Sequence, residues 1–211
     1  MLNGVMNLKQ HKYNIDSKEV QYLLQKDTIL TPLFSLKDEI IVTIDDDYFV
    51  SLAGIIVAQQ LSGKVARVIF NRLEKLCNDS ITAEKISEFK DEDLRGIGIS
   101  FQKIKYLRSL AECHLQKIID FTNLNHLSDD EIINMLIKIK GIGVWSAQMF
   151  LIFSLGREDV FSVGDLGLRN AVKKVYNNPD LTEQEIIKIS ENWMPYRSVV
   201  SHYLWHHTDN K

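Results

Sequence analysis

Apolar residues recur every three or four positions along most of the chain, which is the spacing of one face of an α-helix. The pattern is clearest over residues 47–60, 62–77 and 100–119. The apolar positions of the three segments are Phe49, Leu52, Ala53, Ile56 and Val57; Val65, Val68, Ile69, Leu73 and Leu76; and Ile104, Leu107, Leu110, Ala111 and Leu115. We therefore expect three amphipathic helices in the first half of the chain.

The second half continues this pattern and adds signals for helix starts. Ser128-Asp-Asp-Glu131 and Thr182-Glu-Gln-Glu185 have the form of capping boxes. Residues 197–207 form a last predicted helix, whose apolar positions are Val199, Val200, Tyr203 and Leu204. A strand is suggested only at residues 40–44, so we predict an all-α fold.

Two similar glycine turns interrupt the helical pattern, Gly141-Ile142-Gly143 and the partial echo Gly96-Ile97-Gly98. Glycine lets a backbone turn sharply and approach another surface closely. The free N–H groups of a helix that starts at such a turn form an anion site that fits a phosphate. A turn between core helices with no ligand is the alternative, because a Gly-x-Gly pair alone is weak evidence.

An aspartate between glycines follows the second turn, in Gly164-Asp165-Leu166-Gly167. The glycines would let the backbone and a substrate come close to the carboxylate. The residues after Asp165 continue as a helix, so this side chain could also be a helix N-cap. The two roles are compatible.

The composition is that of an ordinary globular protein, with 211 residues, 45% hydrophobic and 25% charged. No apolar run approaches the ~20 residues of a membrane span, and the N-terminus lacks a secretory pattern. Cys77 and Cys113 form no Cys-x-x-Cys pair. This disfavours a disulfide scaffold, a structural zinc and a four-cysteine iron–sulfur cluster. We expect a cytoplasmic protein, associated with the nucleoid if the source is bacterial.

The net charge of −3 argues weakly against binding nucleic acid through bulk charge. Local contacts stay open, because basic residues gather in some segments and acids in others. The basic positions are Lys64, Arg67, Lys103, Lys105, Arg108, Lys138, Lys140, Arg169, Lys173 and Lys174.

Five blocks of the sequence, taken together and in order, resemble the 3-methyladenine DNA glycosylase II family of the helix-hairpin-helix/Gly-Pro-Asp superfamily. They are residues 51–62, 97–107, 139–147, 163–167 and 193–205. The resemblance implies two helical lobes around a cleft, without a full N-terminal β domain. One lobe would be residues 45–163, and the other would combine 1–44 with 164–211 and carry Asp165 at the cleft.

The same resemblance implies a monomeric enzyme acting on damaged double-stranded DNA. It would release alkylated, cationic purines such as 3-methyladenine or 7-methylguanine, and Asp165 would be the catalytic carboxylate. A fixed carboxylate can stabilise the positive charge that develops on C1′ and can help to activate water. A base that already carries positive charge can leave without an added acid.

Further site residues follow from the position of each block in the family. Trp145 stands where glycosylase/lyases of the superfamily carry the lysine of the Schiff base, which predicts a monofunctional enzyme. Trp145, Trp193 and Tyr196 would form an aromatic base pocket, with Tyr48 or Phe153 as further walls. The alternative is that these rings belong to the core.

Gln60 or Leu61 would be the wedge that fills the gap left by the flipped base. An ordinary helix turn capped by Ser62 is the alternative reading of residues 59–62. The phosphate site would be built from Gly141, Gly143, Val144 and Ser146.

His202, His206 and His207 have helical spacing, but the family pattern requires no metal and we expect none here. We expect no cofactor either, apart from a monovalent cation that the hairpin carbonyls could hold. Two other functions stay open: a non-catalytic helix-hairpin-helix DNA-binding module, and a glycosylase for oxidised or deaminated bases. Asp165 argues against the first. Trp145 and the missing cysteine cluster argue against a lyase of the endonuclease III type.

Overall fold

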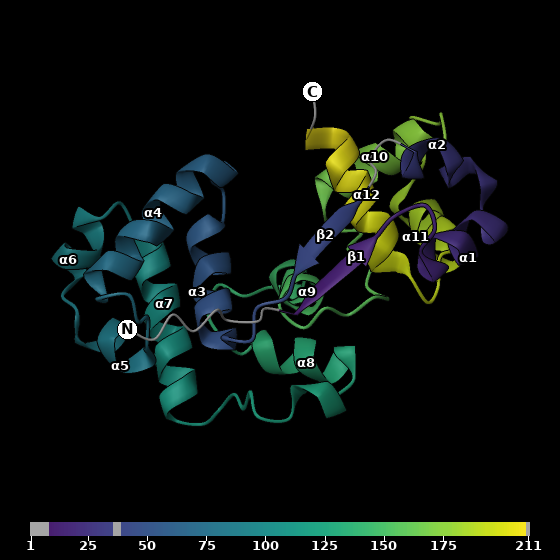
Figure 1. The fold of residues 1–211 in the computed structure, drawn as a ribbon. Helices are drawn as coiled ribbons and strands as arrows, with labels where there is room; N and C mark the ends of the chain where they lie inside the picture. The colour runs from purple at the N-terminus through teal and green to yellow at the C-terminus, as the bar shows by residue number, and fades with distance from the viewer. Residues whose placement is uncertain (1–8, 36–38, 210–211) are drawn as a thin grey trace, which may run out of the picture. The chain divides into compact units, whose positions relative to one another are not determined.

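The computed structural model describes residues 9–35 and 39–209, and helices account for most of them. The helices are α1 Lys18–Lys26, α2 Thr31–Phe34, α3 Tyr48–Ala58, α4 Gly63–Leu76, α5 Ala83–Glu88, α6 Asp91–Gly96, α7 Phe101–Leu115, α8 Asp129–Leu136, α9 Val144–Phe153, α10 Leu166–Val175, α11 Glu183–Glu191 and α12 Arg197–Asp209 (Figure 1). The strands are β1 Gln10–Tyr13 and β2 Ile40–Thr43. The expected all-α class is thus confirmed, with one small sheet in addition. Among these helices, none has both the length and the apolar character needed to cross a membrane.

The chain folds into two compact units. The first, here called the helical unit, is Asp46–Phe150; in Figure 1 it runs from α3, in blue, into α9, in green. The second, here called the terminal unit, combines the chain up to Asp45 with the chain from Leu151 onward. This division falls inside α9, between Phe150 and Leu151, whereas the family resemblance led us to expect it between residues 163 and 164. Asp165 belongs to the terminal unit, and the hairpin glycines belong to the helical unit.

The helical unit is organised around α3 and α7, which pack against each other; α4 packs on α3 and α5 on α7. All five apolar positions expected on α3 are buried. The expectation for α4 is wrong in part, because Val65 and Val68 are each 45% exposed and the buried positions are Ala66 and Leu73. On α7 the expected stripe is buried up to Ala111, while Leu115 is 45% exposed near the helix end.

Helix starts follow the local sequence signals closely. Ser128 and Thr182 both form complete capping boxes, with Glu131 and Glu185 as the returning partners. These side chains satisfy N–H groups that have no partner inside the helix.

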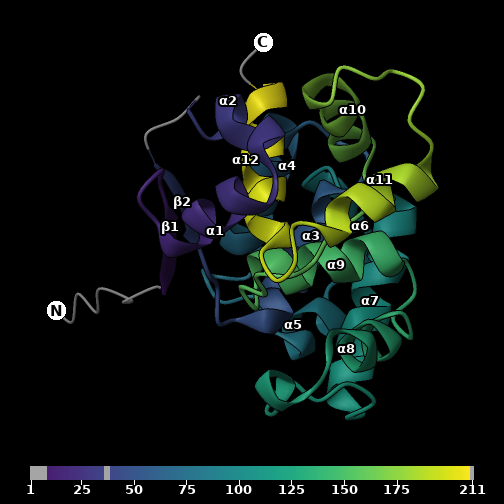
Figure 2. The ribbon, with the colours of Figure 1, turned by 90° about the vertical axis from the view of Figure 1, so that its right-hand side faces the viewer.

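The terminal unit has its own hydrophobic core, built on α1, α10 and α12. Helices α10 and α12 lie side by side in both Figure 1 and Figure 2. Strands β1 and β2 pair antiparallel, with Gln10 opposite Thr43 and Tyr13 opposite Ile40. Strand β2 was expected from its apolar residues. Strand β1 was not, because Gln-His-Lys-Tyr is mostly polar and only Tyr13 is buried.

Candidate functional site

The glycine turn at residues 141–143 joins α8 to α9 and forms a helical hairpin. Its two isoleucines, Ile139 and Ile142, are buried and anchor the turn to the core. The backbone N–H of Lys140 donates to the Ser109 hydroxyl of α7 at 3.0 Å. The carbonyl of Gly143 accepts the first hydrogen bond of α9, from the N–H of Ala147 at 3.0 Å. The first turn of any α-helix offers no carbonyl of its own to its first N–H groups, which is why helix starts attract anions.

The two hairpin glycines serve different purposes. Gly141 has a φ of +87°, and a Cβ built on it would lie 2.2 Å from Cγ of Tyr106. The fold itself therefore requires glycine there. At Gly143, no atom of residues 9–35 or 39–209 lies within 4 Å of such a Cβ, and Gly143 is exposed together with Val144. Space beside Gly143 is thus open to a ligand, which is what close approach of a phosphate needs.

Gln59 ties the hairpin to the preceding turn. Its Nε2 donates to the carbonyl oxygen of Gly141 at 2.8 Å and lies 3.5 Å from Oγ of Ser146. Ser146 was expected to bind phosphate, but the residue is only 4% exposed and its hydroxyl accepts from Gln59. Its hydroxyl is therefore part of the interior, and only its main chain stays a candidate for anion binding. The Gly141 carbonyl, considered for a monovalent cation, already accepts a hydrogen bond.

The expected wedge lies in the same turn, at residues 59–62. Gln60 has a φ of 58° and is exposed, while Leu61 is half-buried. Ser62 is the N-cap residue of α4, yet its side chain makes no capping hydrogen bond. No capping hydrogen bond therefore supports the alternative of an ordinary turn capped by Ser62. Of the two wedge candidates, Gln60 is the more exposed.

Asp165 lies at the N-terminus of α10 and is its N-cap. Its Oδ1 accepts a hydrogen bond from the backbone N–H of Leu168 at 2.8 Å. A Cβ on Gly167 would lie 3.1 Å from this same oxygen, and none of the described atoms is within 4 Å of a Cβ on Gly164. The capping role proposed from sequence is confirmed. It also fixes the carboxylate at a helix N-terminus, where the helix dipole favours negative charge.

Trp205 of α12 is a second donor to Asp165, with its Nε1 at 3.3 Å from Oδ1. Its ring packs on Phe153, with centroids 5.3 Å apart, and on His202 at 5.9 Å. Sequence reasoning placed Trp205 in a family block but gave it no role. The chemistry of the indole could have suggested this role. Its N–H only donates, so a tryptophan that packs against other residues usually has an acceptor nearby.

Behind Trp205, His202 is buried among aromatic rings. Burial, together with the nearby His11, lowers the pKa of the imidazole to about 4. His202 is therefore neutral at pH 7 and is part of the packing that supports Trp205. In the part of the chain that the structure describes, no three His, Cys, Asp or Glu side chains gather as a metal site would require.

The three aromatic residues expected in a base pocket have different surroundings. Trp145 lies at the start of α9 and is 41% exposed, so its ring is accessible to a ligand. Tyr196 is half-buried against the edge of Tyr22, with ring centroids 5.5 Å apart. Trp193 is fully buried, and its Nε1 donates to Asp27 and Tyr176 at 3.3 Å each. Trp193 is thus a core residue, which was the alternative interpretation of these rings.

Comparisons with known proteins identify the family to which the chain belongs. The family described as HhH-GPD superfamily base excision DNA repair protein matches residues 53–195. DNA-3-methyladenine glycosylase 1 of Schizosaccharomyces pombe is 38% identical, over 71% of this chain and 68% of its own length.

Two solved structures are also similar. A DNA-3-methyladenine glycosidase from Bacillus halodurans has a TM-score of 0.84 and 36% identity, covering 95% of this chain and 93% of the other. The S. pombe 3-methyladenine DNA glycosylase Mag1 in complex with abasic DNA has a TM-score of 0.82 and 32% identity, covering 92% and 97%. The matched region contains the hairpin, Asp165 and the Gln59–Gln60 turn. The chain therefore belongs to the HhH-GPD superfamily of base excision DNA repair proteins.

Proposed function

We propose that the chain is a monofunctional DNA glycosylase that releases alkylated, cationic purines, such as 3-methyladenine or 7-methylguanine, from double-stranded DNA. The observation that carries the proposal is the carboxylate of Asp165, oriented by Leu168 and Trp205. The similar proteins named 3-methyladenine DNA glycosylases support the choice of substrate.

Asp165 acts by electrostatics in this mechanism. Breaking the bond between base and sugar develops positive charge on C1′, and a preorganised carboxylate stabilises that charge. A water molecule then attacks C1′, and the same carboxylate can accept its proton. The alkylated base leaves as a neutral molecule because it was cationic before the bond broke. One carboxylate is therefore sufficient.

Trp145 supplies an aromatic face rather than a nucleophile. A tryptophan ring attracts a cationic purine by stacking and cation–π interaction, worth about 0.5–2 kcal/mol. Lacking an amine, it cannot form a Schiff base with the abasic sugar. The product is thus an intact strand with an abasic site. We leave Trp193 out because it is fully buried.

DNA is held mainly through the backbone of the hairpin in this proposal. The N–H groups near Gly143 and Val144 contact phosphates, and Gln60 enters the duplex where the base has left. The protein acts as a monomer in the compartment that holds the DNA, which in a bacterium is the cytoplasm.

The test is a panel of duplex oligonucleotides that carry single damaged bases. We expect release of 7-methylguanine and 3-methyladenine, strand breaks only after alkali, and no release by Asp165→Asn. Release of oxidised or deaminated bases alone would redirect the substrate assignment. Binding without any release would leave a DNA-binding module.

A further inference from the structure

Lys103 makes an unusual contact for a residue in the first turn of a helix. Its Nζ donates to the carbonyl oxygen of Val57, 2.7 Å away in the last turn of α3. Cations are unfavourable near the N-terminus of their own helix and favourable near the C-terminus of another. The start of α7 is already capped by the Ser100 side chain, which accepts from the N–H of Lys103. The charge of Lys103 therefore benefits α3 rather than α7.

This contact lies at the base of the turn that contains Gln60. Val57 is followed by Ala58, the last residue of α3, and by Gln59, which caps it. Gln59 in turn donates to the Gly141 carbonyl. The turn is thus tied twice at its entry, by Lys103 from α7 and by Gln59 to the hairpin. Gln60 comes next, exposed and with a left-handed φ of 58°.

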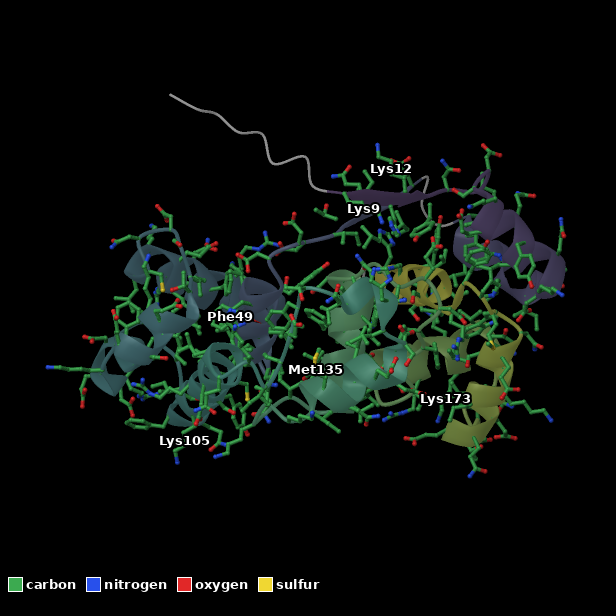
Figure 3. All side chains as sticks on the ribbon, turned by 90° about the horizontal axis from the view of Figure 1, so that it is seen from below. Lys9, Lys12, Phe49, Lys105, Met135 and Lys173 are labelled. Atoms are coloured by element: carbon green, nitrogen blue, oxygen red, sulfur yellow. The ribbon has the colours of Figure 1, made fainter. Side chains whose placement is uncertain are left out.

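Two further features indicate that the Lys103 tie is built in rather than incidental. The side chain is half-buried, and burial lowers the pKa of its ammonium group. Lys105, two positions along the same helix, is exposed and lies at the outer edge of the side chains in Figure 3. Burying the stem of a lysine costs rotamer freedom, and the strong charge-assisted hydrogen bond offsets that cost.

We propose that Lys103 is a positioning residue for base flipping: it holds the end of α3 so that Gln60 is already oriented to enter the duplex. The inference rests on the proposed function and deepens it. A wedge that is ordered beforehand loses less entropy when it enters DNA, so flipping becomes more favourable. A loosened wedge should impair only the step in which the base leaves the stack.

The experiment compares one lesion in two settings. In one duplex 7-methylguanine pairs with cytosine, and in the other it stands opposite a tetrahydrofuran abasic analogue, where less unpairing energy is needed. Single-turnover release is measured with the native protein, Lys103→Met, Lys103→Arg and the control Lys105→Met. The ratio of the two rates in one preparation does not depend on how much of the protein is folded.

We expect Lys103→Met to lose about tenfold in rate on the paired lesion and less than about twofold on the unpaired lesion. Lys103→Arg should give a ratio of the two rates closer to the native value than Lys103→Met does, because arginine keeps the charge and the donors. Lys105→Met should match the native ratio. If Lys103→Met yields no folded protein, Lys103→Gln replaces it and the same ratio is measured.

An equal loss on both duplexes, or no loss on either, would overturn the inference while leaving the proposed function intact. A failure of the proposed function looks different, because the native protein would then release 7-methylguanine from neither duplex. That result would remove the basis of the inference as well.

Discussion

The indole N–H of Trp205 and the carboxylate of Asp165 meet at 3.3 Å, which joins the C-terminal helix α12 to the N-terminus of α10. The same oxygen, Oδ1, also accepts from the backbone of Leu168. Two donors from different elements fix the direction of the carboxylate better than one could. The loop before Asp165 is held as well, because Arg169 donates to the Val163 carbonyl at 2.6 Å.

Asp165→Asn should abolish base release and leave duplex binding largely intact. The amide oxygen of asparagine can still accept from Leu168 and Trp205, so the cap and the fold are kept. Loss of the negative charge should raise the free energy of the transition state by on the order of 3 kcal/mol or more and change that of the ground state little. Single-turnover release and binding to an abasic duplex measure the two effects. Turnover near the native level on a methylated purine would refute the assignment.

Trp205→Phe should slow base release while preserving the packing on Phe153. Phenylalanine keeps an aromatic ring but has no N–H group to donate to Asp165. A hydrogen bond to a charged group contributes about 1.5–3 kcal/mol, so we expect a loss of roughly 10- to 100-fold in the single-turnover rate. Circular dichroism and the thermal midpoint provide the control. A rate unchanged in a folded variant would show that Leu168 alone orients the carboxylate.

The reaction should stop at the abasic site, because position 145 carries tryptophan instead of lysine. Product strands should be cut only after alkali. Borohydride should trap no covalent adduct between protein and DNA, whereas a true glycosylase/lyase in parallel gives a high yield. Trapping at a comparable yield would contradict the monofunctional mechanism and would require a search for another amine.

Substitutions at the two hairpin glycines should affect different properties: DNA binding at Gly143, and the stability of the fold at Gly141. Gly143→Val should weaken binding to all duplexes alike, because valine would fill the space through which we propose that a phosphate approaches. Among the described residues, no atom lies within 4 Å of a Cβ built at Gly143, so the fold should tolerate the change. The preference among damaged bases should not change. If the folded variant binds as tightly as the native protein, the hairpin is only a structural turn.

Gly141→Ala is the matched comparison, and it should destabilise the fold. Its Cβ would overlap the Tyr106 ring, and φ is positive at this position. We expect a loss of about 2 kcal/mol or more in the free energy of unfolding, measured with urea. A stable Gly141→Ala variant would mean that Tyr106 can move aside.

His202 makes the stability of the protein depend on pH. Its pKa in the folded state is lowered to about 4 from the usual 6.5, so the unfolded chain binds more protons between these values. The stability of the folded state that comes from keeping His202 neutral is complete above about pH 6.5 and is lost as the pH falls towards 4. The loss amounts to roughly 3 kcal/mol. Urea unfolding at pH 7 and pH 4.5 should show a smaller difference for His202→Gln than for the native chain. An identical pH dependence in both would contradict this role.

The sequence by itself determined the features that depend on neighbours along the chain. Helix faces such as that of α3, the capping boxes at Ser128 and Thr182, and the N-cap at Asp165 are all decided within one or two turns. The turn at Gly141 and Gly143 could also be located, since glycine is required where φ is positive or another surface comes close. The resemblance of the hairpin block to the family pattern led us to expect Trp145 in place of a lysine.

Only the tertiary structure decided which side chains meet. Gln59 and Gly141 are 82 positions apart, and Trp205 and Asp165 are 40 apart, so no local pattern links either pair. Trp193 and Ser146 looked like site residues, but packing from distant segments buries both. The physical reason is that hydrophobic periodicity reports which face of an element is buried, while the partners across that face are set by how the elements pack.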